Sequence, residues 1–372
     1  MKKYLVVGAG FSGAVLANTL ARELDCKVIV LDERNHIAGN CHTEREVETG
    51  VMVHKYGPHI FHTSNKEVWD YVNSFVKFIP FINRVKAVYQ KQVYSLPINL
   101  HTINQFFGLS LDPKEAREFI EKKGDVSIEE AKTFEEQAKK FVGEELYRAF
   151  FYGYTRKQWG CEPKELPASI LKRLPVRFNY DDNYYNDVYQ GIPEEGYTAI
   201  VEKMLNHSNI EVHLNTKFSP DNEKYKDYDH VFYTGPVDAF FKYKHGKLRY
   251  RTVYFKRYEA LGDYQGNAVI NYADETIPYT RVHEHKHFTP WETHEKTVYF
   301  EEYSKATEEN DTPYYPIRLK EDMDKYELYE KEVYALKDFT FLGRLATYRY
   351  MDMHHVIDEA LQIAKEFVRK CL

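Results

Sequence analysis

The sequence has few cysteines, and they lie far apart. The four are Cys26, Cys41, Cys161 and Cys371. No two of them have the CxxC spacing that is typical of zinc sites and redox motifs. Their number and spacing fit reduced thiols, so we expect a cytoplasmic protein.

Long hydrophobic runs and an excess of positive charge are also missing. No stretch approaches the roughly 20 apolar residues that span a bilayer, and glycines soon interrupt the first apolar run, unlike in a secretory signal. The formal net charge is −6, which predicts no general attraction to nucleic acid. We therefore expect neither a membrane nor a nucleic-acid partner. A length of 372 residues predicts two or three domains.

What is present is a glycine motif close to the start. The apolar residues 4–7 predict a buried strand, and Gly8, Gly10 and Gly13 follow as GxGxxG ahead of a helical pattern. These glycines permit a tight turn, a close approach to a pyrophosphate, and close packing of helix on strand. A second apolar run ends at Asp32, where an acid accepts a hydrogen bond from a ribose hydroxyl. The pattern predicts a Rossmann-type dinucleotide-binding domain.

The residues after this acid favour FAD over NAD. Glu33 and a basic residue come next, followed by a small-residue turn, Ala38–Gly39, and by Asn40. Flavoproteins of the amine-oxidase type carry this extended fingerprint. Their usual Gly–Gly is Ala–Gly here, a difference that matters if the alanine needs a positive φ.

Histidines stand out at two places. His59 and His62 follow a Gly57–Pro58 turn. They could bind a metal, but no third ligand residue is near them in the sequence, so a ring contact to flavin or a structural role is favoured. The alternating histidines of residues 283–287 would share one face of a strand. A charged, solvated edge is favoured there, and we predict no metal site.

A helical pattern from residue 102 to 174 predicts a small inserted domain. It ends in residues 150–160, which mix aromatic, hydroxyl and basic side chains, and arginines and tyrosines continue through residues 171–185. Aromatics that stack on a base and arginines that grip phosphates suit a nucleotide-sugar. An aromatic packing face followed by a solvated loop explains the pattern equally well. A late strand ending in Gly343–Arg344, followed by a helix, is expected to close the FAD domain.

The predicted fold class is α/β, with a Rossmann-type FAD-binding domain, an inserted helical domain and an antiparallel β-sheet domain. The FAD-binding domain is expected to comprise residues 1–78, 191–245 and 318–372. The helical insert is expected at 98–178, with a mobile substrate loop near 165–178. The antiparallel sheet, a substrate domain, is expected from residues 79–97, 179–190 and 246–317.

The motifs together resemble the bacterial UDP-galactopyranose mutase family. The likeness runs through nearly the whole chain and includes VVGAGFSGAV, YGPHIFHT, GYTRKQWG, LPASILKRLPVRFNYDDNYY, YTRVHEHKHF and GRLATYRYMDMH. It implies an isomerase that interconverts UDP-galactopyranose and UDP-galactofuranose without net redox change, through a covalent adduct between N5 of reduced FAD and galactose. It also implies a homodimer and a supply of galactofuranose for a surface polysaccharide, as in lipopolysaccharide or capsule biosynthesis.

The resemblance also implies roles for single residues. Arg173 and Arg281 correspond to the catalytic arginines that clamp the diphosphate, Arg173 on a mobile loop, and His59 corresponds to a catalytic histidine beside the flavin. The further substrate-binding residues that it implies are Asn83, Phe151, Tyr154, Thr155, Trp159, Tyr184, Asn271, Glu302, Tyr315 and Tyr350. The cofactor-binding residues are Gly8, Gly10, Ser12, Gly13, Asp32, Glu33, Gly39, Asn40, His59, Ile60, Gly343, Arg344, Tyr350, Asp352, Met353 and Val356. Tyr314 and Tyr315 are adjacent, so which of them faces the diphosphate stays open.

Three alternatives remain at this point. An amine-oxidase-like FAD oxidoreductase would share the FAD frame but needs neither Arg173 nor Arg281. A nucleotide-binding protein without turnover would keep the fold. A mutase that also accepts UDP-N-acetylgalactopyranose would need room for an acetamido group, and His59 stands where that room would be. The sequence does not indicate the electron donor.

Overall fold

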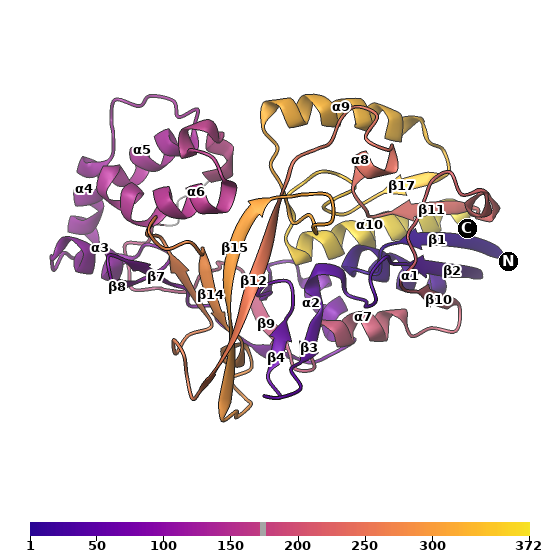
Figure 1. Ribbon diagram of the computed structural model, residues 1–372, viewed down its shortest axis with the longest axis horizontal. Helices are drawn as coiled ribbons and strands as arrows, with labels where there is room; N and C mark the ends of the chain where they lie inside the picture. The colour runs from indigo at the N-terminus through magenta and orange to yellow at the C-terminus, as the bar shows by residue number, and fades with distance from the viewer. Residues whose placement is uncertain (172–175) are drawn as a thin grey trace.

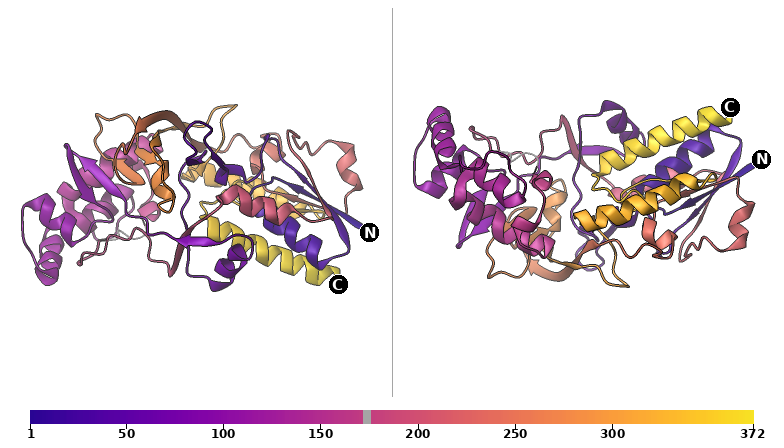
Figure 2. Two further views of the ribbon diagram at one scale, coloured as in Figure 1. Left: turned by 90° about the horizontal axis from the view of Figure 1, so that it is seen from below. Right: turned by 90° about the horizontal axis from the view of Figure 1, so that it is seen from above.

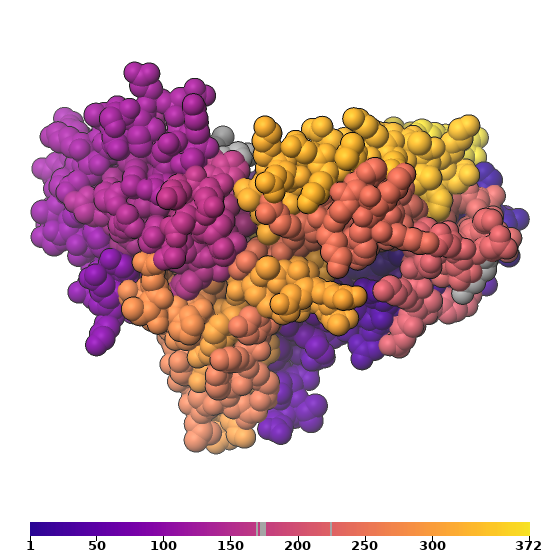
Figure 3. All heavy atoms as spheres, turned by 45° about the horizontal axis from the view of Figure 1, so that its top comes forward, coloured from indigo at the N-terminus to yellow at the C-terminus, as the bar shows by residue number. Residues whose placement is uncertain are grey.

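The computed structural model describes residues 1–171 and 176–372, which form three regions in a row. A lobe of helices lies at one end, a twisted sheet stands in the middle, and a parallel sheet with its helices lies at the other end (Figure 1). Both termini lie at the parallel-sheet end (Figures 1 and 2). The space-filling view shows the helical lobe and the α8–α9 side as two masses that the central strands join (Figure 3).

The parallel sheet is built from distant parts of the chain. Its strands, in spatial order, are β10 (Ile210–His213), β2 (Cys26–Leu31), β1 (Lys2–Val7), β11 (His230–Tyr233) and β17 (Phe339–Phe341). Its helices are α1 (Phe11–Glu23), α7 (Tyr197–Leu205) and α10 (Met353–Cys371), and α1 packs between the other two. Figure 2 shows α10 running alongside α1. The predicted Rossmann-type fold is confirmed, and the first and last elements of the chain do meet.

The helix α10 shows why the C-terminal segment packs on α1. Its apolar residues recur at the spacing that places them on one face of a helix. Five of them are buried in the same core as Leu16 of α1: Ile357, Ala360, Leu361, Ala364 and Val368. The C-terminal helix therefore closes the nucleotide-binding core that the first strand begins.

The central sheet has seven strands and is mixed. In spatial order they are β16 (Tyr315–Pro316), β12 (Tyr250–Leu261), β15 (Lys296–Ala306), β14 (Arg281–Glu284), β13 (Val269–Tyr272), β7 (Lys86–Tyr89) and β8 (Gln92–Ser95). All neighbours are antiparallel except β13 and β7, which are parallel. The predicted antiparallel sheet domain is confirmed, apart from this one parallel pair. Hairpins dictate antiparallel pairing, whereas β7 and β13 are far apart in the sequence and no hairpin fixes their direction.

The helical lobe sits on the far end of this sheet. Its helices are α3 (Leu100–Phe107), α4 (Pro113–Lys123), α5 (Phe134–Leu146) and α6 (Gly153–Trp159), with a π-helical turn, Tyr147–Tyr152, before α6. Asn99, Asp112 and Thr133 cap the N-termini of α3, α4 and α5 through their side chains. The last helix of the lobe, α6, also packs on β15 and so joins the lobe to the middle of the central sheet.

Smaller elements link the three regions. They are the pair β3 (Thr43–Arg45) and β4 (Met52–His54), the sheet of β5 (Phe61–Thr63), β9 (Tyr189–Pro193) and β6 (Phe78–Pro80), and the helices α2 (Lys66–Asn73), α8 (Val237–Phe240) and α9 (Lys320–Ala335). Among the described residues, no helix has the length and apolar character needed to cross a membrane.

Candidate active site

The glycine loop between β1 and α1 has the geometry that its motif predicts. Gly8 has φ +107°, and a Cβ atom there would overlap the Thr234 hydroxyl. A Cβ atom on Gly13 would overlap the carbonyl oxygen of Gly8. Both positions therefore need glycine for backbone reasons, so Gly13 sets the close packing of α1 on the turn.

Gly10 is different, because the space beside it is open. A Cβ atom on Gly10 would come no closer than 3.9 Å to Gly39 Cα, and no side chain caps the N-terminus of α1. The helix thus presents its free N–H groups to a gap between two glycines, which is the arrangement that receives a diphosphate. Ala38, in the turn that carries Gly39, has φ +71°, so alanine occupies a strained position where flavoproteins of the amine-oxidase type usually have glycine.

Asp32 holds the glycine loop in place. Its carboxylate accepts hydrogen bonds from the backbone N–H groups of Ala9 at 2.8 Å and Arg34 at 2.9 Å. The neighbouring Glu33 is exposed, and Ser12 lies under Gly343, whose Cβ atom would come within 2.6 Å of the Ser12 hydroxyl. The predicted cofactor residues of the first and last strands therefore come together.

Arg34 is a cofactor candidate that the sequence reasoning did not single out. It donates from Nη2 to Asn40 Oδ1 at 2.8 Å, and its guanidinium lies 4.7 Å from the centre of the Tyr56 ring. Its Nη1 is buried and has no hydrogen-bond partner among the described residues. A buried guanidinium with an unused donor fits a phosphate, and the basic residue after the β2 acid was the available signal.

A pocket opens between the Rossmann-type region and the central sheet. Most of the residues that line it were predicted as site residues, although they come from elements far apart in the chain. The lining comprises Asn40, Tyr56, Gly57, Pro58, His59, Ile60, His62, Tyr185, Val253, Arg281, Glu302, Tyr314, Tyr315, Arg344, Tyr350, Asp352, Met353 and His354. Val356 does not line it, and packs instead against the core beside α1.

Arg281 and Glu302 form an ion pair on the floor of this pocket. They stand directly opposite each other on β14 and β15. Glu302 Oε1 accepts from Nε at 3.0 Å and from Nη2 at 2.7 Å, and Oε2 accepts from Nη2 at 2.8 Å. The carboxylate holds the pKa of Arg281 well above its usual range. The pair uses Nε and Nη2 and so leaves Nη1 outside it.

Two arginines and several tyrosines surround the mouth of the pocket. Tyr315 and Tyr350 stack with ring centres 5.7 Å apart, and Arg344 lies 5.6 Å and 5.2 Å from the centres of those rings. Tyr314 is buried beside Tyr56. Tyr315 is therefore the tyrosine that faces Tyr350, while its neighbour packs toward the cofactor side.

The phenols near Arg281 keep their protons. Partial burial raises the pKa values of Tyr154, Tyr184 and Tyr350, although Tyr184 and Tyr350 are 41 % and 56 % exposed, and the Arg281 guanidinium acts on all three in the opposite direction. A protonated phenol can donate a hydrogen bond to an anionic oxygen. These three tyrosines thus place hydrogen-bond donors beside the Arg281 guanidinium, where both can bind the same anion.

Two amide side chains carry unused acceptors beside this cluster. Asn271 stands opposite Arg281 on β13, and its Oδ1 is buried with no partner among the described residues. Asn83 is 3 % exposed, and its Oδ1 is likewise buried with no hydrogen-bond partner among the described residues. Buried amide oxygens normally have a hydrogen-bond donor, so these two call for donors from a bound ligand.

On the helical-lobe side, Thr155 is buried in α6, and Phe151 and Trp159 are half-buried against the lobe core. Tyr154 lies on the same helix and within electrostatic reach of Arg281, Glu302 and Tyr315. Because α6 packs on β15, the predicted nucleotide-binding helix lies beside the strand that carries Glu302, although none of its residues lines the pocket. Arg173 lies outside the described residues, as does the centre of the predicted substrate loop.

His59 is neutral and has a defined tautomer. Its Nδ1 lies 2.8 Å from the Gly57 carbonyl oxygen, which can only accept, so Nδ1 carries the proton. Burial lowers the pKa of His59 to about 4, and Arg344 and Arg281 act in the same direction. Its Nε2 is therefore a lone-pair acceptor on the pocket wall.

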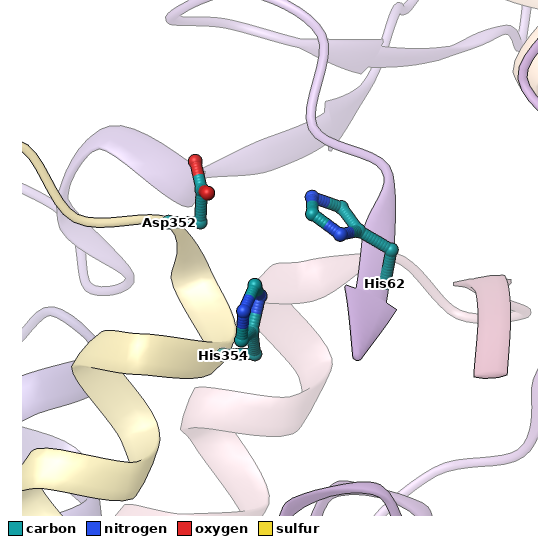
Figure 4. A group of neighbouring side chains, drawn as sticks. All are labelled: His62, Asp352 and His354. Atoms are coloured by element: carbon teal, nitrogen blue, oxygen red, sulfur yellow. The ribbon is translucent and has the colours of Figure 1, made fainter. Parts of the chain in front are cut away.

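His62 belongs to a second cluster in the pocket wall. Its Nδ1 donates to Asp187 at 2.6 Å, and its ring stacks on Tyr185 at 3.7 Å. Figure 4 shows His62 on β5 pointing toward Asp352 and His354 at the start of α10, and the possible ligand atoms of these three lie within 4.8 Å of one another. No further ligand residue lies near His59 and His62 in the sequence. The fold brings Asp352 and His354 to His62 from almost three hundred residues away.

The expected solvated edge at residues 283–287 is wrong. His283 and His285 are fully buried, and β14 ends at Glu284, so the histidines do not share one strand face. His285 accepts from the backbone N–H of His54 at 3.2 Å. These histidines are buried because β4 covers this part of the sheet. The burial lowers the pKa of His285 to about 3.

Two family models match the chain. The model of the UDP-galactopyranose mutase family matches residues 149–350. A model described as an NAD(P)-binding Rossmann-like domain matches residues 6–75. The first match covers α6, the central-sheet strands β12 to β16 and every tyrosine of the pocket lining except Tyr56, and the second covers the glycine loop.

Two relatives match almost end to end. A probable UDP-galactopyranose mutase from Klebsiella pneumoniae is 56% identical over 99% of this chain and 95% of its own length. A dTDP-fucopyranose mutase from Escherichia coli is 51% identical over 99% of both chains. The two names differ in both the nucleotide and the sugar.

Solved structures agree on the fold. A crystal structure of reduced UDP-galactopyranose mutase superposes with a TM-score of 0.78 at 14% identity, covering 100% of this chain and 94% of the other. A putrescine oxidase variant superposes with a TM-score of 0.62 at 11% identity, covering 99% of each chain. At these identities the likeness concerns the fold alone.

Proposed function

Since this chain belongs to the UDP-galactopyranose mutase family, we propose that it interconverts UDP-galactopyranose and UDP-galactofuranose with reduced FAD and without net redox change. Its general activity, whichever nucleotide-sugar it acts on, is that of an isomerase that converts a pyranose ring to a furanose ring. The observation that carries the proposal is the Arg281–Glu302 pair, with its ring of tyrosines, in the same pocket as the cofactor residues.

The residues at the glycine loop fit FAD. The gap between Gly10 and Gly39 leaves room for the diphosphate, and the unused Nη1 of Arg34 supplies a cation. Gly343, Arg344 and Met353 would border the flavin and its ribityl chain. When bound in its reduced form, the flavin supplies the nucleophile for the anomeric carbon of the sugar.

The task of Arg281 is to bind the departing diphosphate. Breaking the anomeric bond leaves negative charge on the nucleotide, and a fixed guanidinium stabilises that charge without reorganising at the moment of reaction. Glu302 fixes the guanidinium through two of its nitrogens. In this arrangement Nη1 is the nitrogen directed to the phosphate.

The other polar groups orient the substrate. Protonated Tyr154, Tyr184 and Tyr350 donate hydrogen bonds to the phosphates or the sugar, since a phenol with its ordinary pKa of about 10 keeps its proton at neutral pH. Neutral His59 accepts a hydrogen bond from a sugar hydroxyl or the flavin through Nε2. Buried Asn271 accepts one from the nucleotide.

A second candidate substrate is a dTDP-6-deoxy sugar, because one relative at 51% identity is a dTDP-fucopyranose mutase. That substrate differs by a methyl group on the base, a missing ribose hydroxyl and a missing sugar hydroxyl. All of the residues named above would serve either substrate. Acceptance of a 2-acetamido sugar is a third possibility, and the wall at His59 is where it would be decided.

One assay separates these candidates. The dithionite-reduced, FAD-loaded protein is incubated anaerobically with UDP-galactose, dTDP-fucose or UDP-N-acetylgalactosamine, and the products are separated by chromatography. We expect the highest kcat/KM for UDP-galactose. A higher value for dTDP-fucose would reassign the substrate but keep the mutase reaction. No mutase turnover with any of the three sugars, together with oxygen-dependent oxidation of an amine in a separate aerobic assay, would support the oxidoreductase instead.

We also propose a homodimer and a role in galactofuranose supply for a surface polysaccharide. Light scattering during size-exclusion chromatography tests the first proposal, and surface glycan analysis of a deletion strain tests the second. A monomer at micromolar concentration would refute the dimer and leave the chemistry untouched.

A further inference from the structure

Lys157 is a charged residue for which the proposed chemistry has no use. Its ammonium group donates to four backbone carbonyl oxygens, those of Tyr272 at 2.6 Å, Asp274 at 2.8 Å, Ile277 at 3.0 Å and Tyr279 at 3.0 Å. An ammonium has three hydrogens, so at least one of them is shared between two carbonyls. One side chain thus holds the turn between β13 and β14 by hydrogen bonds to four of its carbonyl oxygens.

That turn leads directly into the phosphate-binding end of the site. Its last residues are Tyr279 and Thr280, and Arg281 begins β14. The turn is closed by Tyr272 N–H donating to the Thr280 carbonyl at 2.9 Å, and Thr280 N–H donates to the Glu302 carbonyl at 2.8 Å. The position of the turn therefore helps to set the backbone from which Arg281 projects.

Lys157 itself belongs to the opposite side of the site. It lies on α6 between Tyr154 and Trp159, and a Cβ atom on Gly153 at the start of this helix would overlap the Ala273 carbonyl oxygen. Helix and turn are therefore in direct contact, and the ammonium spans the contact. Among the described residues, this lysine joins the helix with the predicted base-stacking side chains to the strand with the phosphate-binding arginine.

Resting on the proposed function, we infer that Lys157 is a positioning residue that holds the β13–β14 turn on α6 and so presets the spacing between the nucleotide-binding face of α6 and Arg281. The ammonium reaches the backbone and not the pocket, since it is absent from the pocket lining. Its effect on substrate binding would therefore pass entirely through the turn.

The neighbouring Arg156 offers a matched control. It also joins α6 to this turn, by an ion pair with Glu275, but both side chains are largely exposed. Exposed ion pairs contribute little to stability. Lys157, by contrast, is half-buried, and burial lowers its pKa to about 8, while Asp274 and Glu275 act in the opposite direction. Removing the two cations should therefore have very different effects.

The experiment compares Lys157→Met with Arg156→Met in FAD-loaded protein. Without the ammonium, the turn must be ordered when the nucleotide binds, and that cost weakens binding; once the nucleotide is bound, the same site is assembled. We expect K157M to raise the Kd for UDP and the KM for UDP-galactose by about tenfold, and to lower kcat by less than threefold. R156M should stay within about twofold of the unmodified protein in all three.

Hydrogen–deuterium exchange makes the test independent of the proposed reaction. In ligand-free protein, the amides of residues 272–281 should exchange faster in K157M and at the unmodified rate in R156M. Unchanged exchange in K157M would overturn the inference, as would a fall in kcat with unchanged KM. If K157M loses FAD, Lys157→Gln, which keeps two donors, replaces it in the same measurements. Failure of the unmodified protein to bind UDP or dTDP would instead overturn the proposed function and leave the exchange result standing.

Discussion

The Arg281 guanidinium and the Glu302 carboxylate stand opposite each other on β14 and β15, joined through Nε and Nη2 at 2.7–3.0 Å. Glu302 is 1 % exposed and also accepts from the Thr280 hydroxyl at 3.1 Å. The pair converts a flexible side chain into a cation with a fixed direction. The phosphate-binding role proposed for Arg281 depends on this partner.

Replacing Glu302 with glutamine should therefore impair both stability and activity. The substitution keeps the shape but leaves the charge of Arg281 without its partner, and breaking a buried ion pair typically costs about 3–5 kcal/mol. We expect Tm to fall by several degrees and kcat/KM by about tenfold or more. Glu301→Gln is the control, because Glu301 bonds Tyr303 and not Arg281; equal losses in both variants would remove Glu302 from the site.

Arg281→Ala should nearly abolish mutase turnover while FAD content stays close to normal; Tm should fall by several degrees, as in E302Q, because the buried Glu302 carboxylate loses its partner. Loss of one preorganised donor to developing charge costs about a hundredfold or more in kcat. Arg281→Lys should rescue poorly, because lysine keeps the charge but lacks the fork that Glu302 holds. Arg257→Ala is the control, since Arg257 is exposed and pairs with Glu46 and Glu259.

The same loss is expected for Arg173→Ala on the grounds of the family resemblance. Arg177→Ala should be less sensitive, because Arg177 donates to the carbonyl oxygens of Asp181 and Asn183. Near-normal turnover in R173A would withdraw that arginine from the diphosphate clamp.

Two glycines of the loop should respond differently to substitution. Gly10→Ala adds a methyl group into open space at an ordinary φ of −80°, so the apoprotein should keep its Tm while FAD affinity falls. Gly13→Val places atoms where the Gly8 carbonyl oxygen lies, so both Tm and FAD content should fall. Flavin absorbance after gel filtration, together with thermal melts, measures both. Full flavin content in G10A would mean that the gap is not the diphosphate site.

Acid should destabilise the protein through its buried histidines. The pKa values of His285 and His59 are lowered by burial to about 3 and about 4, below the ordinary 6.5. Between pH 6.5 and 4 the unfolded chain binds protons that the folded chain does not, so stability falls as pH falls, by up to about 1.4 kcal/mol per pH unit for each such histidine. Urea unfolding at pH 7 and pH 5 measures this. His285→Gln should flatten the dependence, whereas replacing exposed His101 should not; an unchanged slope in H285Q would contradict the assignment.

The local parts of the fold could be predicted from the sequence. Gly8, Gly13 and Asp32 act within one turn of strand and helix, so their spacing carries their geometry. The strand that ends in Gly343–Arg344 was expected to close the FAD domain, and β17 does so at the edge of the parallel sheet, beside β11. The chemistry of Arg281 came from the resemblance, but its partner across the sheet required the register of β14 and β15.

What could not be predicted depends on contacts between distant segments. The burial of His283 and His285 comes from β4, which lies more than two hundred residues earlier in the chain. The other two groups of the His62 cluster, Asp352 and His354, come from the start of α10, and the parallel pairing of β7 follows no hairpin. In the sequence, Lys157 is one of two adjacent basic residues, with Arg156. Only the fold shows that its ammonium holds the turn between β13 and β14.

The measurement that tests the central claim most directly is the interconversion of UDP-galactofuranose and UDP-galactopyranose by FAD-loaded protein, followed by anaerobic chromatography with and without dithionite. The flavin is a nucleophile only when reduced, so we predict turnover with dithionite, none in rigorously oxidised protein, and at least about a hundredfold less in R281A. Equal turnover by oxidised protein, or none by the reduced protein with either UDP- or dTDP-linked sugars, would contradict the account.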